Sequence, residues 1–224
     1  MVDPEAQPID AYATFADYQG RQTVTPGDSD PVGQALVSAS RQLDRELKMM
    51  PRGFGPIDEA TFYFESDGGP SLYLLDGDAS FPLRTVSADG IRPDYDHSGD
   101  HDSSDYAWDL ADVFVWPRPR NAQALGYPYR RIDLRALGNA PITSWPYPPG
   151  TVRITGTWGW PEVPPPIRDI TVYVARQMRD TTSGGAAQVL AQMEDGVGVS
   201  DTMWRLWLRV KREYHQGDFA SLGL

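Results

Sequence analysis

The chain has no cysteine among its 224 residues, which excludes disulfides, thiol catalysis and cysteine-ligated zinc or iron–sulfur centres. It has only three histidines, His97, His101 and His215, and no G-x-S-x-G turn that would expose a catalytic serine. The phosphate-binding pattern G-x-x-x-x-G-K-[ST] is also missing. We therefore expect neither an enzyme nor a bound cofactor.

Long apolar runs are missing as well. None approaches the ~20 residues of a membrane-spanning helix, and the start MVDPEAQPID is too acidic for a secretory signal. We therefore expect no membrane partner. Glycine (21 residues), proline (20 residues) and aromatic residues (11%) are plentiful. This composition favours a turn-rich chain with β structure over a plain helical bundle.

The net charge of −11 is distributed unevenly. Residues 65–112 carry twelve acidic residues against Arg84 and Arg92, whereas residues 161–216 carry seven of each sign. Acidic surfaces repel DNA phosphates, so tight nucleic-acid binding is not expected from the acidic region. Such a surface suits either DNA that slides past it or simple solubility.

Apolar residues at helical spacing predict helices towards both ends of the chain. Thr14 and Asp17 form a capping-box pattern before a short helix. A longer helix is expected from Asp30, as its N-cap, to about Pro51. The segments VPPPIRDITVYVARQMRD and SDTMWRLWLRVKREYH carry apolar stripes, and GAAQVLAQME between them is expected to be a marginal helix.

Between these helical regions, short apolar runs separated by turn residues predict five or six antiparallel strands. Hairpins are expected at residues 67–69 and at Asp89-Gly90. The predicted fold class is α+β: a small helical bundle, with an N-terminal helix and two or three C-terminal helices, that carries an inserted antiparallel β-rich domain. The expected parts are an N-terminal arm with the first core helix (1–56), the β-rich insertion (57–160), the C-terminal core helices (161–216) and a tail (217–224).

The segment DYDHSGDHDSSD approximates a calcium-binding loop. Asp94, Asp96 and Ser98 stand at ligand positions one, three and five, with glycine at position six. However, aspartate replaces the usual glutamate at position twelve, and no helix leads into the loop. The alternative is an acidic segment that faces solvent or a DNA channel, with the candidate residues Asp94, Asp96, Asp100, Asp102 and Asp105.

The last predicted helix places Arg205, Arg209 and Arg212 on one face. They either contact nucleic acid or pair with acidic neighbours in the same or an adjacent chain, and the second interpretation is favoured. Trp158 and Trp160 are candidate stacking platforms, but core or subunit-interface anchors are favoured at these positions.

The segment VRITGTWGWPEVPPPIRDITVYVARQMRD resembles part of the head-tail connector (adaptor) proteins of long-tailed, double-stranded DNA bacteriophages. In that family a strand V-x-[VI]-x-[AG]-x-[WFY]-G-[WY] leads through x-x-[VI]-P into a helix. The matching residues are Val152, Ile154, Gly156, Trp158, Gly159 and Trp160 in the strand, Val163 and Pro164 in the joint, and Ile167, Arg168 and Val174 in the helix. Ile170 and Thr171 depart from the family, which often has a small alanine there.

The order of the other parts is similar too. A short FADY helix, a helix ending SRQLDRELKMMPR and a β-rich insertion beginning ATFYF follow the family's order. The resemblance thus covers residues 12–214. The segment at residues 94–112 is longer than in minimal members of the family.

The resemblance implies a structural virion protein without catalysis. Such connectors are assembled in the host cytoplasm and form a homo-oligomeric ring, usually twelve-fold, under the portal protein at the neck. The ring extends the channel for genomic DNA, which passes non-specifically, and docks the next head-completion or tail-terminator protein. The C-terminal helix and tail, with Phe219, Leu222 and Leu224, would contact the portal. Trp158 and Trp160 would wedge a rigid corner between strand and helix.

Two other classes stay open. Exposed aromatic residues and the calcium-like segment suit a carbohydrate- or cell-wall-binding β module. Another neck component, such as a stopper or a tail terminator, is the second alternative. Those proteins are mostly β structure, so the strong helical patterns argue against them.

Overall fold

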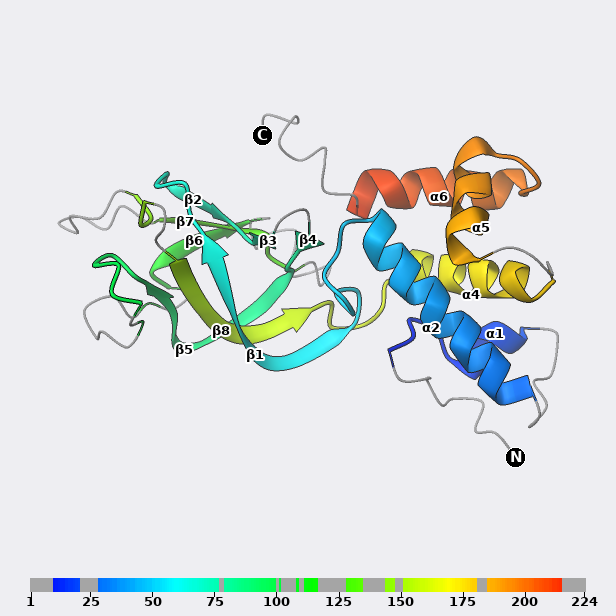
Figure 1. The fold of residues 1–224 in the computed structure, drawn as a ribbon, viewed down its shortest axis with the longest axis horizontal. Coiled ribbons are helices and arrows are strands. Elements are labelled where there is room, and N and C mark those ends of the chain that lie inside the picture. Colours follow the sequence, from blue (N-terminus) through cyan, green and yellow to red (C-terminus); the bar gives the residue numbers. More distant parts are fainter. Residues whose placement is uncertain are drawn as a thin grey trace. The chain divides into compact units, whose positions relative to one another are not determined.

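The computed structural model describes residues 10–20, 28–76, 79–99, 101, 108, 111–116, 128–134, 144–147, 151–180 and 185–214. Helices lie towards both ends of this chain and antiparallel strands lie between them, which confirms the α+β class (Figure 1). Within these ranges no helix has the length and apolarity needed to cross a bilayer.

The chain folds as two compact units. A helical unit combines Met1–Phe54 with Glu162–Leu224, and a β unit consists of Gly55–Pro161. The sequence placed the corresponding boundaries after residues 56 and 160. In the helical unit, α2 (Ser29–Glu46) packs against α4 (Pro165–Asp180), so segments from the two ends of the chain share one core.

The short helix α1 (Phe15–Gln19) has the predicted capping box. The Thr14 backbone N–H donates to the Asp17 carboxylate at 2.7 Å, and the Asp17 N–H donates to the Thr14 hydroxyl at 3.1 Å. Arg176 of α4 holds α1 in place. Its guanidinium lies 5.4 Å from the centre of the Tyr18 ring, and its Nε donates to the Tyr18 carbonyl at 3.0 Å.

Asp28, and not Asp30, is the N-cap of α2, so that prediction is wrong. The Asp28 side chain makes no capping hydrogen bond and instead forms an ion pair with Arg179 of α4 at 3.0 Å. Asp30 lies in the first turn, where a negative charge complements the helix dipole. The predicted apolar stripe of α2 is fully buried, and its residues are Val32, Leu36, Ala39, Leu43 and Leu47.

Prolines set the start of α4. The Pro164 carbonyl accepts the N–H groups of Ile167 and Arg168 at 3.0 and 3.1 Å. Pro165 and Pro166 occupy the first turn, where backbone N–H groups have no acceptor within the helix, so proline loses no hydrogen bond there. The sequence of this joint therefore specifies where the helix begins.

The described part of the helical unit also contains α5 (Ala186–Asp195) and α6 (Asp201–Tyr214). The expected marginal helix α5 spans 10 residues and ends at Gly196, whose φ of 68° is the left-handed conformation that suits glycine. Both α5 and α6 pack against α4 and against each other. Their buried side chains are Ala186, Val189, Leu190, Met193, Trp207, Val210 and Tyr214.

The described residues of the β unit form three antiparallel sheets. The largest has the order β1-β8-β5, from β1 (Pro56–Glu65), β8 (Thr151–Gly159) and β5 (Leu83–Pro93). A second has the order β2-β7-β6, from β2 (Ser71–Tyr73), β7 (Arg131–Leu134) and β6 (Val113–Trp116). The third pairs β3 (Leu75–Asp76) with β4 (Ala79–Ser80). In Figure 1, β1 and β8 run side by side as long curved strands.

Neither predicted hairpin forms. The strands on both sides of residues 67–69 do not pair, because β1 pairs with β8 and β2 pairs with β7. At Asp89-Gly90 the chain makes a bulge within the continuous strand β5, with Asp89 at φ 52°. Turn residues at both places are compatible with a local reversal, but pairing with distant strands prevails.

Gly156 lies where β1 and β5 approach the central strand β8. Both edge strands shift register beside it, between Ile57 and Ala60 in β1 and between Val86 and Ile91 in β5. A Cβ atom on Gly156 would lie 2.0 Å from the Thr85 carbonyl oxygen. Glycine therefore permits the close approach that curves this sheet.

Candidate interaction surfaces

Trp158 belongs to the core of the β unit. Its side chain has 0% exposure, its Nε1 donates to the Ala60 carbonyl at 3.0 Å, and its ring contacts Phe62, Phe64 and Phe81. Because no surface of Trp158 remains, it is a core residue in this fold and offers nothing for a second copy to contact. Trp160 is also buried, at 4% exposure.

The arginines of α6 lie on its exposed face. Arg205 pairs with Asp201 at 3.0 Å, and Arg209 pairs with Glu213 at 2.8 Å, each one turn away along the helix. These contacts follow the favoured interpretation, and exposed pairs of this kind contribute little stability. Arg212 is exposed and has no ion pair with a residue in the described part of the chain. Phe219, Leu222 and Leu224 lie outside the described residues.

The start of the acidic segment forms a hydrogen-bonded turn. The Asp94 carboxylate accepts the N–H groups of Ser98 and Gly99 at 3.2 and 2.9 Å. The Asp96 carboxylate accepts the Ser98 hydroxyl at 2.8 Å, and this hydrogen bond lowers the pKa of Asp96 below its usual value. These carboxylates thus cap backbone groups of their own turn.

The rest of the calcium alternative cannot be placed, because Asp100, Asp102 and Asp105 lie outside the described residues. Among the residues that the structure does describe, no group of three histidine, aspartate or glutamate side chains is arranged to hold a metal ion.

The outer face of the β1-β8-β5 sheet is polar and includes two arginines. Along β8, buried Val152 and Ile154 alternate with Arg153, Thr155 and Thr157, which point away from the core. The neighbouring strands add Thr61 and Tyr63 from β1, and Thr85 and Arg92 from β5. We call these seven residues the Arg–Thr face: Thr61, Tyr63, Thr85, Arg92, Arg153, Thr155 and Thr157.

The outer face of the β2-β7-β6 sheet is aromatic. The Arg131 guanidinium lies 5.9 Å from the centre of the Tyr73 ring and 4.6 Å from that of Trp116, one on each neighbouring strand. Arg131 also pairs with Asp133 at 3.0 Å. Tyr73 is 50% exposed and Phe114 is 44% exposed. Exposed aromatic residues beside an arginine are typical of binding surfaces.

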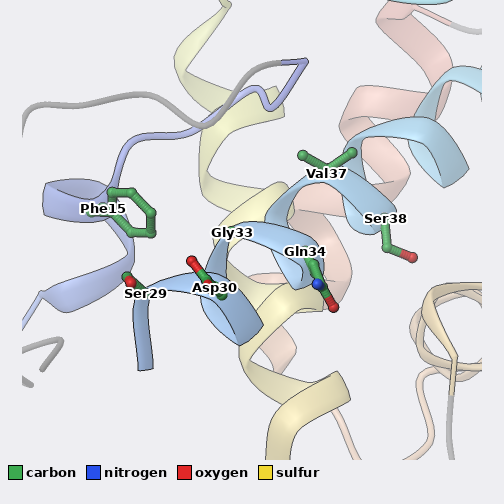
Figure 2. A pocket seen from close by; sticks show the side chains of 7 residues that line it. All are labelled: Phe15, Ser29, Asp30, Gly33, Gln34, Val37 and Ser38. Atoms are coloured by element: carbon green, nitrogen blue, oxygen red, sulfur yellow. The ribbon is translucent and has the colours of Figure 1, made fainter. Parts of the chain in front are cut away.

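A groove of about 560 Å³ lies between α1 and the first half of α2 (Figure 2). Phe15 of α1 forms one wall, and the α2 side contains Asp30 and several small or polar residues. Asp30 is the one ionisable residue in this lining, so the groove offers packing surface without a reactive group. Its lining residues are Phe15, Ser29, Asp30, Gly33, Gln34, Val37 and Ser38.

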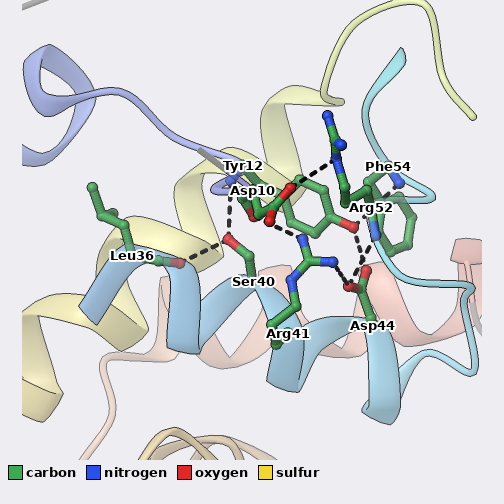
Figure 3. Close-up of polar contacts among 8 residues, drawn as sticks. All are labelled: Asp10, Tyr12, Leu36, Ser40, Arg41, Asp44, Arg52 and Phe54. Carbon is green, nitrogen blue, oxygen red and sulfur yellow. Dashed lines mark hydrogen bonds and ion pairs between the residues drawn. The ribbon is translucent and has the colours of Figure 1, made fainter. Parts of the chain in front are cut away.

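A buried polar network connects the N-terminal arm to α2 (Figure 3). The Tyr12 hydroxyl donates to the Asp44 carboxylate, which also pairs with Arg41 at 2.8 Å. The Arg52 N–H donates to Asp44 at 3.3 Å, and the Phe54 N–H donates to the Tyr12 hydroxyl at 3.4 Å. This Tyr12–Asp44 network therefore ties the N-terminal arm to α2 and to the segment that follows α2.

Burial dominates the ionisation of this network. It raises the pKa of Asp44 to about 6, against the lowering effects of the Tyr12 hydrogen bond and the Arg41 charge. Burial also raises the pKa of the Tyr12 hydroxyl well above its usual value. Sequence reasoning missed this network, because Tyr12 and Asp44 are separated by 32 positions and neither belongs to a recognisable motif.

Comparison with protein-family models, with curated proteins and with solved structures found no match to this chain.

Proposed function

We propose that the protein is a head-tail connector: a structural virion component that forms a ring under the portal and extends the DNA channel. The observation that carries the proposal is the segment from β8 to α4. It combines the strand VRITGTWGW, the joint PEVPPP and a helix start in the order of the connector family. The helical unit is built from both ends of the chain, and the β unit lies between these two parts in the sequence. This order supports the same assignment.

In the proposed arrangement the helices form a small bundle, and the β-rich domain is an insertion into it. Identical copies close a ring, in which one face of each copy meets a different face of the next. The partners are other copies in a twelve-fold ring, the portal protein, and the next head-completion or tail-terminator protein. Genomic DNA passes through without specific binding, and the location is the neck of the virion.

The proposal is tested by mixing the protein with its portal and measuring the mass of the complex. A connector adds a fixed number of copies to each portal ring, whereas the protein alone stays smaller. A matched mixture with the Trp158→Ala variant, whose β-unit core is disrupted, should fail to give the same defined complex. If the wild-type protein adds no mass to the portal, the proposal is wrong.

The aromatic outer face of the β2-β7-β6 sheet favours a second candidate, a carbohydrate- or cell-wall-binding module. Tyr73 and Phe114 expose apolar surface beside the Arg131–Asp133 pair, a combination of ring surface and hydrogen-bonding groups that suits sugars. A glycan screen with wild-type protein and a Tyr73→Ala, Phe114→Ala variant separates the two functions. Binding that depends on these side chains would favour the second candidate.

A further inference from the structure

The β1-β8-β5 sheet has two outer edges, and they differ in what covers them. At the edge of β5, the Leu83 N–H donates to the Tyr129 carbonyl at 2.8 Å, and the Ile91 N–H donates to the Trp108 carbonyl at 2.9 Å. β1 pairs with β8 on one side and forms no bridge to another residue of the described chain on its other side. In the part of the chain that the structure describes, every second residue of β1 therefore directs its N–H and C=O groups to an edge without a partner strand.

The second half of β1 is a regular strand. Proteins usually protect exposed edges with proline, lysine or a bulge, and the first half of β1 has two of these features, Pro56 and the register shift between Ile57 and Ala60. Residues 61–65 (TFYFE) then pair with β8 without interruption and have none of these protective features. Threonine, phenylalanine and tyrosine also favour extended backbone. We call residues 61–65 the β1 edge, and it is a template to which another strand can be added.

The side chains of the β1 edge alternate between two faces. Thr61, Tyr63 and Glu65 are exposed on the outer face of the sheet. Phe62 points into the core, where its ring centre lies 4.9 Å from that of Phe81, yet it stays partly exposed. An added strand would cover Phe62 with apolar side chains on one face, and its other side chains would lie beside polar residues.

The charge around the β1 edge is negative. β1 contains Asp58, Glu59 and Glu65, which are all exposed, and it contains no lysine or arginine. Arg153 of β8 pairs with the middle of the β1 edge, whereas Thr151, opposite Glu65, is uncharged. The β unit as a whole has 15 acidic and 8 basic residues. A cationic segment is therefore attracted to this edge, most strongly near the acidic residues at its two ends.

We infer that the β1 edge binds an extended segment of a partner protein, which adds to the sheet as a further strand. The segment carries lysine or arginine near Asp58 and near Glu65, and apolar side chains over Phe62. A second copy of this chain is a poorer occupant, because two β1 strands would bring only acidic charges together. Sheet geometry and charge define this site whether or not the protein is a connector.

The probe is the blocked peptide acetyl-Lys-Val-Thr-Val-Thr-Val-Lys-amide, which is titrated into the full-length protein. Two derivatives carry backbone N-methyl groups, one on its valines and the other on its threonines. Because successive N–H groups of a strand point to opposite sides, only one of these two sets can donate to β1. N-methylation changes neither the charge of the peptide nor the protein, so the comparison isolates strand pairing.

We expect one derivative to bind like the parent peptide and the other to bind at least about tenfold more weakly, because it loses several backbone hydrogen bonds. Hydrogen exchange followed by NMR should become slower at alternate amides of residues 61–65 when the parent peptide is bound. Equal affinities of the two derivatives, or no binding of the parent peptide, would overturn the inference. Slow exchange at these amides without peptide, in a concentration-dependent dimer, would overturn it in favour of a second copy.

The role of charge is tested with the variant Asp58→Asn/Glu65→Gln. Its matched control is Asp180→Asn/Asp195→Asn, which loses the same charge from exposed positions of α4 and α5. The β1 variant should bind the parent peptide about threefold to tenfold more weakly at low salt, and the control should stay within about twofold of the wild type. Equal weakening in both variants would contradict a cationic partner at this edge, because net charge alone would then attract the peptide.

Discussion

The Tyr12 hydroxyl donates a hydrogen bond to the carboxylate of Asp44, and this contact joins the N-terminal arm to α2. Asp44 is only 3% exposed, so water solvates its negative charge very little. The same carboxylate contacts Arg41 and the backbone of Arg52. The region just before the β unit thus depends on one buried acidic group.

Asp44→Asn should change the pH dependence of stability. The folded-state pKa of Asp44 is raised from 3.8 to about 6, so protonation favours folding. Its stabilising contribution is present below pH 3.8 and is lost as the pH rises through 6. The stability of the wild type relative to Asp44→Asn should therefore fall by up to about 3 kcal/mol between pH 4 and pH 7. Urea unfolding of both proteins across this range measures the difference, and a constant difference would contradict the assignment.

Tyr12→Phe should destabilise the helical unit by about 1–3 kcal/mol. The substitution keeps the ring but leaves a buried carboxylate and the Phe54 N–H without the hydroxyl. Tyr63→Phe is the matched control, because Tyr63 is 56% exposed and its loss of a hydroxyl should change stability by less than about 0.5 kcal/mol. Chemical denaturation measures both values, and equal effects would show that the Tyr12 hydroxyl has no special role.

Gly156→Ala should destabilise the β unit by about 2–4 kcal/mol, because the new methyl group meets the Thr85 carbonyl oxygen at 2.0 Å and the strands must separate. Gly185→Ala is the control. No heavy atom lies within 4 Å of a Cβ at Gly185, so its cost should stay below about 1 kcal/mol. Thermal unfolding followed by near-ultraviolet circular dichroism reports the aromatic core, and a Gly156→Ala protein as stable as the wild type would refute the close approach.

Truncation after Gln216 should leave the melting temperature unchanged and weaken portal docking. This prediction follows from the proposed function, in which the apolar tail residues Phe219, Leu222 and Leu224 contact the portal. A full-length variant with serine at these three positions separates the loss of apolar contacts from the loss of chain length. Docking of both variants at wild-type strength would exclude the tail as a portal contact.

Neutralising the acidic candidates should alter DNA ejection if they face the channel. Replacing Asp94, Asp96, Asp100, Asp102 and Asp105 by asparagine removes five negative charges and keeps oxygen atoms for the turn at Ser98. Weaker repulsion of the phosphates should slow the passage of DNA. Ejection kinetics of assembled particles measure this effect, and unchanged kinetics would assign the segment to outside solvent.

Local features of the sequence predicted much of the helical unit. The capping box of Thr14 and Asp17, the apolar stripe of α2 and the proline start of α4 each depend on residues a few positions apart. The N-cap of α2 was predicted at Asp30 and lies at Asp28, so this prediction missed by two residues.

Strand pairing could not be predicted in the same way. β1 and β8 lie at opposite ends of the β unit in sequence but pair with each other. No short pattern in either strand identifies the other as its partner. Glycines at residues 68 and 69 favoured a hairpin because turn propensity is local, whereas the energy of the sheet comes from distant partners.

For the candidate surfaces too, contacts between residues close in sequence could be predicted, whereas contacts between distant residues could not. The ion pairs of Arg205 and Arg209 within α6 follow from helical spacing and were anticipated. The β1 edge and the contact of Tyr12 with Asp44 depend on tertiary structure. Such sites become visible only when strand register or helix packing is known.

Electron microscopy of the protein mixed with its portal tests the central claim most directly. The account predicts side views in which a second, continuous ring lies against one end of the portal, coaxial with its channel, in the wild-type mixture. Portal particles without an added ring, at protein concentrations well above those in an infected cell, would contradict it.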